Sequence, residues 1–324
     1  MSAHIFIQGE KFTNTGSIIQ WIASRTGWPV VTDSDLIRQA GERFGMGPEK
    51  IERVLQRRGG AMKRVQYQRK KATAYLKSVL AETLRSEAGI LCGMAGHLIP
   101  AKMPHVLRVL VTANAADRIR RATQDRDLPE KEARRQIKMS DSQSFQRHCH
   151  FTGNDGPRSA SYDVVVPSDV LDTEAAARLI LEHLTEKANA ATEVVAKALD
   201  DFTLTADVQR VISEKGYDIT AMAEDSNVRL TVDRRVFRLG KMSQKLKRMV
   251  AAMPDVGAVD VVVGRDFHRT DIVRRARFEM SSAMQFEGYA RHRRRLRRSA
   301  TGDLPADIKQ RPEPTIGIGR PLSL

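Results

Sequence analysis

Short apolar runs alternate with longer amphipathic stretches through the first part of the chain. Strand candidates are residues 4–7, 28–32, 89–92, 106–112 and 162–166. Apolar positions with helical spacing lie between or after them, at residues 18–23, 48–87, 117–125, 129–139 and 173–202. Strands that alternate with helices predict an α/β fold, with a parallel sheet covered by helices on both faces.

A second, smaller unit follows. Residues 205–215 and 242–253 have helical spacing, residues 217–223 and 227–232 read as a hairpin around Asp225-Ser226, and residues 256–263 form a last strand candidate. This α-β-β-α-β order predicts a small α+β domain. We expect three parts: an α/β domain at residues 1–200, the α+β domain at residues 203–267 and a largely disordered tail at residues 268–324.

The loop after the first strand has the position of a phosphate-binding loop, because a strand precedes it and a helix follows. Glycines let backbone N–H groups converge on phosphate oxygens, and Ser17 is expected to cap the helix and to offer a hydroxyl to magnesium. The candidate phosphate- and nucleotide-binding residues are Gly9, Lys11, Thr13, Asn14, Thr15, Gly16 and Ser17.

The chemistry of this loop is incomplete. No lysine precedes Ser17, and the bulky Phe12 and the β-branched Thr13 and Thr15 restrict the backbone. Lys11 is the one lysine inside the loop that offers a substitute cation. The alternative is a strand-to-helix turn that binds nothing.

Composition narrows the class of protein. The chain of 324 residues has a net charge of +15, with 41% hydrophobic and 29% charged residues. It has no long apolar run and no signal-like N-terminus, so we expect a cytoplasmic protein without a transmembrane segment. Cys92 and Cys149 are too few for a disulfide framework or a four-thiolate metal site.

Much of the positive charge lies in residues 274–298, which begin with Arg274 and end with Arg298. This stretch contains nine arginines and only two acidic residues, Glu279 and Glu287. Such a stretch suits a nonspecific nucleic acid or an anionic surface, and few aromatic residues lie among the arginines, so binding would be electrostatic. The alternative is a solvated tail.

An ordered set of segments resembles the cytidylate kinase-like family, a branch of the P-loop nucleoside monophosphate kinases. The segments are residues 28–37, 89–96, 106–111 with 116–119, 130–141, 151–153 and 162–166. The resemblance covers about residues 1–185 and implies that the loop binds donor phosphates of ATP with magnesium.

The resemblance also implies roles for residues outside the loop. Lid-side arginines would stabilise the transferring phosphoryl group together with Lys11, and carboxylates after the first helix would border the acceptor. The lid and catalytic candidates are Arg118, Arg121, Arg126 and Arg134, with Asp141 closing the lid helix; the acceptor candidates are Asp33, Asp35 and Gly93. For each arginine, a solvated helix charge is the alternative.

Departures from the family pattern point toward eroded catalysis. The loop lacks its glycine-rich run, Met94 replaces an arginine, and Ser142, Gln143 and Ser144 stand where basic residues are usual. We therefore expect a regulatory or signalling protein that binds a nucleotide or a partner. The alternatives are an active kinase that transfers phosphate from ATP to CMP by means of Lys11, and a protein that binds nucleic acid through its tail.

The second unit resembles a BON-like module. Residues 228–232 and 253–261 have the pattern of a strand and of a helix end that leads through Pro254 into another strand. The resemblance implies a domain that binds a protein partner or a surface rather than a catalytic one.

Overall fold

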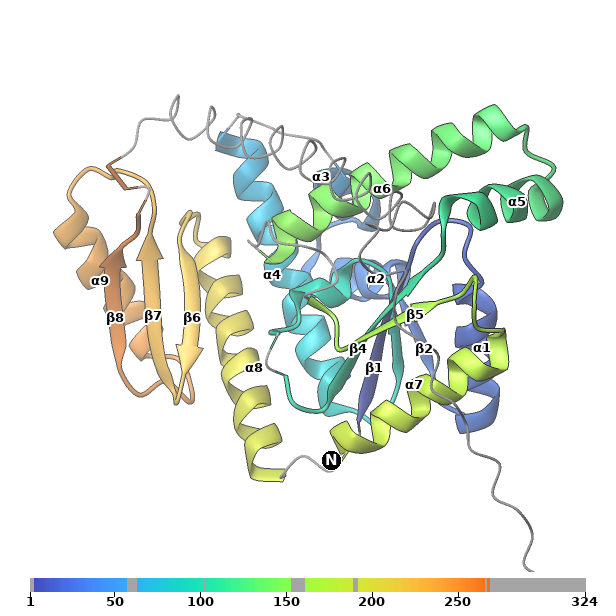
Figure 1. The fold of residues 1–324 in the computed structure, drawn as a ribbon. Coiled ribbons are helices and arrows are strands. Elements are labelled where there is room, and N and C mark those ends of the chain that lie inside the picture. Colours follow the sequence, from blue (N-terminus) through green and yellow to red (C-terminus); the bar gives the residue numbers. More distant parts are fainter. Residues whose placement is uncertain are drawn as a thin grey trace, which may run out of the picture. The chain divides into compact units, whose positions relative to one another are not determined.

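The computed structural model describes residues 3–56, 63–101, 103–152, 161–188, 192–265 and 267–268 (Figure 1). The first part contains β1 (His4–Gly9), α1 (Thr15–Thr26), β2 (Val30–Thr32), α2 (Asp33–Phe44), α3 (Pro48–Gln56), α4 (Lys63–Arg85), β3 (Ile90–Cys92), the 3-10 helix η1 (Ala95–Leu98), β4 (Val106–Thr112), α5 (Ala115–Arg126), α6 (Glu130–Thr152), β5 (Val164–Pro167) and α7 (Thr173–Ala188). The second contains α8 (Thr192–Glu214), β6 (Thr220–Glu224), β7 (Asn227–Val232), α9 (Leu239–Ala251) and β8 (Val259–Val263).

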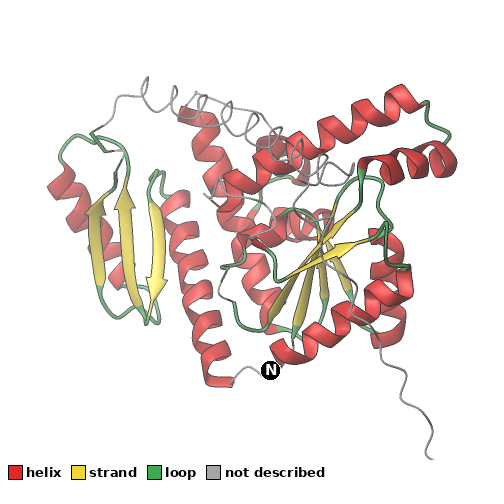
Figure 2. Cartoon of the chain, viewed as in Figure 1, coloured by secondary structure: helices red, strands yellow, loops and turns green. Residues whose placement is uncertain are grey.

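The five strands of the first part form one sheet in the order β2-β3-β1-β4-β5. Every neighbouring pair is parallel, and β1 lies at the centre with Ile5 opposite both Ile90 and Leu107. Figure 2 shows this sheet in yellow with red helices around it. The parallel α/β fold predicted from the alternation of elements is confirmed.

Side chains of β1 alternate between two hydrophobic cores. Phe6 packs with residues of α2, α3 and α4 on one face of the sheet. Ile5 and Ile7 pack with residues of α1 and α7 on the other. Because successive strand residues point to opposite faces, a strand buried on both faces reads as a continuous apolar run, and this is why residues 4–7 lacked a polar alternation.

The smaller sheet has the order β6-β7-β8. β6 and β7 form the expected hairpin, and its turn residues Asp225 and Ser226 both have positive φ, 52° and 62°. β7 pairs with β8 in parallel, with α9 between them in the sequence. The element order therefore matches the predicted α-β-β-α-β unit, while residues 269–324 of the expected tail lie outside the described residues.

Several helix boundaries differ from the prediction: α6 continues to Thr152, past the expected end at residue 139, and α8 begins at Thr192, inside the helix expected at residues 173–202. α8 runs without a break through residues 202–205, where the pattern suggested two helices. Its first half contributes Val195, Leu199 and Phe202 to a core of the larger sheet. Its second half contributes Leu204 and Val208 to the core of the smaller sheet. The apolar side of α8 therefore changes direction partway along one continuous helix. In the sequence this change interrupts the helical spacing of apolar residues, so it looks like the end of one helix and the start of another.

Among the residues that the structure describes, none forms a helix with the length and apolar character needed to cross a membrane.

Candidate functional site

The loop after β1 joins the central strand to α1 beyond the carboxyl ends of the strands, where parallel sheets hold their ligands. The N–H of Glu10 donates to the carbonyl of Val111 at 3.0 Å, and the N–H of Thr13 donates back to the carbonyl of Glu10 at 3.3 Å. Between them Phe12 has a φ of 64°, a left-handed conformation that costs a non-glycine residue about 1 kcal/mol or more. The loop is thus tightly turned without the glycines that usually permit such a turn.

Two threonine hydroxyls fill the inside of this turn. The Thr13 hydroxyl donates to the carbonyl of Glu10 at 2.7 Å, and its oxygen lies 2.7 Å from the hydroxyl oxygen of Thr15. Since Thr13 has already used its proton, Thr15 is the donor of the second bond. A Cβ on Gly9 would lie only 2.1 Å from Oγ1 of Thr15, so Gly9 is needed to admit this side chain.

The start of α1 corrects the role expected of Ser17. The helix begins at Thr15 with Asn14 as its N-cap residue, so Ser17 lies inside the first turn and does not cap the helix. Counted from Gly9, the spacing G-x-x-x-x-G-K-S/T places Thr15, the first helical residue, where the motif has its lysine. Asn14 instead ties the loop to α7, since its Nδ2 donates to the Thr173 hydroxyl at 3.2 Å.

Arg118 is a buried hub, and only 1% of its surface is exposed. Its Nε donates to the carbonyl of Lys11 at 2.8 Å, and its Nη1 lies 3.1 Å from Oε2 of Glu10. The other side of the guanidinium meets both oxygens of Asp141, at 3.1 and 2.7 Å. Arg118 therefore ties the loop to α5 and α6, and its position is that of a structural cross-link.

A cleft of about 580 Å³ opens beside the loop, a volume in the usual range for ligand pockets. The loop, α1, α5 and the start of α6 contribute its lining, which consists of Lys11, Phe12, Thr13, Asn14, Ser17, Arg121, Asp125, Arg126, Leu128 and Gln136. Three cations and one carboxylate face this space, so the cleft is suited to an anion. Leu128, Gln136 and Asp125 were not predicted from the sequence, because they only meet the loop through the fold.

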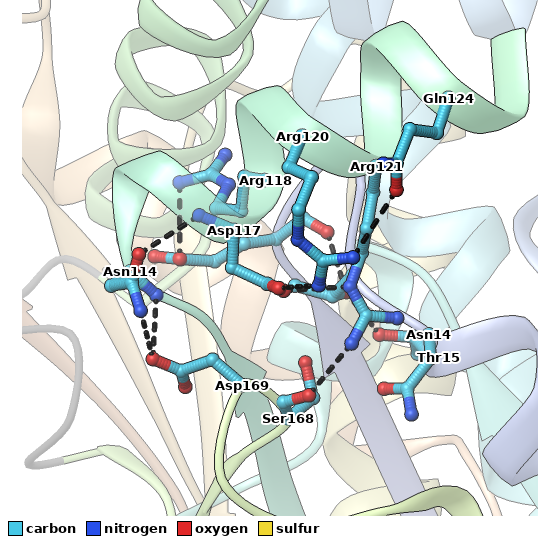
Figure 3. Close-up of polar contacts among 12 residues, drawn as sticks. Asn14, Thr15, Asn114, Asp117, Arg118, Arg120, Arg121, Gln124, Ser168 and Asp169 are labelled. Atoms are coloured by element: carbon cyan, nitrogen blue, oxygen red, sulfur yellow. Dashed lines mark hydrogen bonds and ion pairs between the residues drawn. The ribbon is translucent and has the colours of Figure 1, made fainter.

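The three cations of the cleft are held differently. Arg121 is fixed: its Nε donates to Oδ2 of Asp117 at 2.6 Å and its Nη2 donates to the carbonyl of Ser168 at 2.9 Å (Figure 3). Lys11 lies 5.1 Å from the centre of the Phe12 ring. Neither Lys11 nor Arg126 forms an ion pair with another described residue, so both charges remain available to a ligand.

Arg134 lies outside this arrangement. It is exposed on α6, pairs with Glu130 one turn before it, and is not among the residues that line the cleft. A contact of this kind between i and i+4 stabilises the helix surface by a few tenths of a kcal/mol. Of the four arginines predicted at the lid, Arg121 and Arg126 thus line the cleft, whereas Arg118 and Arg134 are not among its lining residues.

Two of the three acceptor candidates, Asp33 and Gly93, meet in the turn between β3 and η1, and the Asp33 carboxylate is engaged there. The Asp33 carboxylate accepts N–H bonds from Met94 and Ala95, each at 2.8 Å. Burial raises the pKa of this carboxyl, although the two backbone bonds oppose the shift. Gly93 has a φ of 121°, and a Cβ there would lie 2.4 Å from Cγ of Asp33. Asp33 and Gly93 therefore close the turn after β3.

Asp35 has a different local role. Its carboxylate accepts from the hydroxyl and N–H of Thr32 at 2.6 and 3.0 Å, and its own N–H donates to that hydroxyl, which forms the capping box of α2. The bond from the Thr32 hydroxyl is the main reason that the pKa of Asp35 is lowered. Asp35 thus begins a helix. The positive charge of Arg147 on α6 acts on the neighbouring Asp33 and opposes the rise in the pKa of that carboxyl.

A parallel sheet in this strand order, with a turn after the central strand and a cleft between that turn and two helices, defines the P-loop kinase-like class of α/β folds. A family model described as the cytidylate kinase-like family matches residues 7–170. The chain belongs to this family, as the ordered segments of its sequence indicated.

Many chains of solved structure are similar to this one, among them the following three. An uncharacterized protein from Eubacterium ventriosum ATCC 27560 shares 16% identity with this chain, over 57% of it and 99% of the other, with a TM-score of 0.46. Shikimate kinase from Bacteroides thetaiotaomicron shares 15% over 56% and 98%, with a TM-score of 0.34. Shikimate kinase from Acinetobacter baumannii, in complex with shikimate, shares 11% over 59% and 97%, with a TM-score of 0.33. A search of curated proteins gave no match.

Proposed function

We propose that the protein binds a phosphate-bearing nucleotide in the cleft and transfers its phosphoryl group poorly, so that binding serves regulation. The observation that supports this most directly is the contrast between the cleft and the loop. Lys11, Arg121 and Arg126 line a ligand-sized space, whereas Thr15 occupies the loop at the position of the motif's lysine.

The loss of catalysis follows from charge. Phosphoryl transfer depends on cations that neutralise the transition state, and one arginine supplied there contributes about 10³–10⁵ in rate. Here Arg118 is engaged with Glu10 and Asp141, and Met94 is a buried apolar residue where the family has an arginine. Nucleotide binding does not require cations placed for the transition state, because the two unpaired cations also attract the phosphates of the bound ground state.

Magnesium would enter only with the nucleotide. Among the described residues there is no group of histidine, cysteine, aspartate and glutamate side chains fit to hold a metal ion. The spacing counted from Gly9 places Gly16 where the motif has its magnesium-binding hydroxyl. Ser17, one residue later, lines the cleft and forms no hydrogen bond with its described neighbours through its hydroxyl, so it is the side chain that would meet a magnesium ion held mainly by phosphate oxygens. When bound, the ion would neutralise phosphate charge.

The test measures stabilisation of the folded chain by the ligand. A ligand that binds only the folded state raises the melting temperature, so ATP with magnesium should stabilise the wild-type chain and should do so less for K11A/R126A. K131A/R135A is the matched control, since it removes two exposed cations from α6 outside the cleft lining. ATP that fails to stabilise the wild type at millimolar concentration would reject the proposal.

An active nucleoside monophosphate kinase is the second candidate, favoured by one observation: Lys11 faces the cleft without an ion-pair partner among the described residues. It requires that CMP be phosphorylated by ATP at ordinary enzyme rates, and that Lys11→Ala abolish this turnover. Turnover of that size would overturn the regulatory proposal even if nucleotide binding were found.

A further inference from the structure

The smaller unit presents a cationic surface that the nucleotide cleft does not use. Between residues 234 and 252 the sequence has seven basic residues and no acidic one. Arg234 is engaged with Asp218 at 3.2 Å, and Lys247 approaches Asp260 at 3.7 Å. The remaining five form no ion pair within the described part of the chain; we call them, with Phe237, the α9 surface: Arg235, Arg238, Lys241, Lys245 and Arg248.

The cations of α9 follow one side of the helix. Lys241, Lys245 and Arg248 are exposed and stand at spacings of four and three residues, which places them on one face with about 6 and 4.5 Å between them along the axis. Leu246 and Val250 point the other way and are fully buried in the core of the sheet. The helix is thus anchored by its apolar face and offers a row of positive charge.

An exposed aromatic side chain lies just before the start of this helix. Phe237 is 87% exposed, and the guanidinium of Arg238 lies 5.2 Å from the centre of its ring. Arg238 itself has a φ of 58° and is the N-cap residue of α9, so the ring and the first cation lie next to the helix start. Exposing a whole phenylalanine ring to water is unfavourable by about 1.5–3 kcal/mol relative to burial, so a partner that covers it gains affinity.

We propose that the α9 surface binds single-stranded nucleic acid, with phosphates along Lys241, Lys245 and Arg248 and a base stacked on Phe237. A row of cations beside an exposed aromatic ring is the arrangement by which proteins hold single strands without sequence preference. A duplex offers the phosphates but keeps its bases stacked, so it would use only the cations.

Charge and area disfavour other occupants. A second copy of this surface would bring like charges together, and so would the arginine-rich residues 274–298 of the same chain. A lipid surface would attract the cations, yet a single ring gives little apolar area to insert, and stable attachment needs more than one weak signal. The inference is independent of the nucleotide cleft.

The test measures binding of the full-length chain to a fluorescent oligouridylate at several salt concentrations. The slope of log K against log salt is negative, and the triple variant K241Q/K245Q/R248Q should reduce its magnitude by about 2, as expected when three phosphate contacts are lost from a single strand. The matched control R25Q/K50Q/R53Q removes the same charge from exposed positions on α1 and α3 and should keep the wild-type slope. An equal slope for wild type and K241Q/K245Q/R248Q would overturn the proposal.

A comparison of two ligands, oligouridylate and inorganic polyphosphate, separates base stacking at the α9 surface from charge attraction. Phe237→Ala should weaken oligouridylate binding about fivefold or more, the lower end expected for one stacked base, and should leave binding of inorganic polyphosphate unchanged. Equal weakening of both, or of neither, would contradict base stacking. The oligouridylate measurements on the wild type and on the variants are repeated in a chain whose nine arginines in residues 274–298 are replaced by glutamine. Oligouridylate binding that is lost with those arginines alone would reject the proposal. Stronger binding to phosphatidylserine vesicles than to oligouridylate would also reject it.

Discussion

Arg118 and Asp141 are joined by two hydrogen bonds of 3.1 and 2.7 Å, both out of contact with solvent. The same guanidinium also holds the carbonyl of Lys11 and the carboxylate of Glu10 in the loop after β1. One side chain thus fixes the geometry of the loop relative to α6. An arginine in this position stabilises the fold around the cleft instead of closing over a phosphate.

Arg118→Ala should therefore destabilise the fold. The substitution leaves the Asp141 and Glu10 carboxylates without their shared cation, and removal of one partner of a buried ion pair costs about 3–5 kcal/mol. Urea unfolding followed by circular dichroism measures the loss. Arg120→Ala is the control on the same helix: Arg120 is exposed and its loss should change the free energy of unfolding by no more than about 0.5 kcal/mol. A loss below about 1 kcal/mol for Arg118→Ala would mean that the hub is not structural.

Gly93 and Asp33 should be coupled in stability. Gly93→Ala forces a left-handed φ on a residue with a Cβ and pushes that Cβ into the Asp33 carboxylate, so we expect a loss of about 1–3 kcal/mol. Asp33→Ala removes the clash, so the double variant should lose less than the two single losses combined, by about 0.5 kcal/mol or more. Gly16→Ala is the control, since its Cβ meets nothing within 4 Å. Additive losses in the double-mutant cycle would count against this contact.

Acid should destabilise the protein through His4. Burial, and then the charge of nearby His105, lower the pKa of His4 from 6.5 to about 4, so the folded state favours the neutral ring. Between pH 6.5 and pH 4 the unfolded chain therefore binds a proton at His4 that the folded chain does not. The contribution of His4 to the free energy of unfolding is complete above pH 6.5 and is lost as the pH falls toward 4. We expect a loss of about 2 kcal/mol from pH 8 to pH 5 that His4→Phe removes. Urea unfolding at both pH values measures it, with His183→Gln as the control; an unchanged pH dependence in His4→Phe would contradict the assignment.

A lysine at the start of α1 should strengthen nucleotide binding. Thr15 stands at the position of the motif's lysine, and a charge-assisted hydrogen bond to phosphate contributes about 1.5–3 kcal/mol. Thr15→Lys should raise the affinity for ATP about tenfold or more in a fluorescence titration. Thr15→Leu supplies bulk without charge and should give no gain. Equal affinities of the two variants would show that the missing cation is not what limits binding.

The fold was predictable because its signals are local. The apolar runs that became β1 and β4 are short and bounded, and Asp225-Ser226 marked the hairpin turn. The site was predictable in place, since a loop after the first strand of a parallel sheet lies at the ligand edge. Lys11 and Arg126 line the cleft, and their roles in binding stay predictions.

The roles of individual charges were not predictable in the same way. Arg118 and Arg121 look alike in the sequence, yet one is buried and the other lines the cleft. The difference depends on Glu10 and Asp141, which lie 108 and 23 residues away from Arg118. Spacing shows which residues share a helix face, but not which face meets a carboxylate from another element.

Isothermal titration calorimetry of the wild-type chain and K11A/R126A with ATP and magnesium measures directly whether the cleft binds a nucleotide through its two unpaired cations. The wild type should bind saturably, and the variant about tenfold or more weakly, because two unpaired cations are lost from the cleft. K131A/R135A should bind like the wild type. No heat of binding at millimolar ATP, or equal affinity in the wild type and K11A/R126A, would contradict binding through these cations.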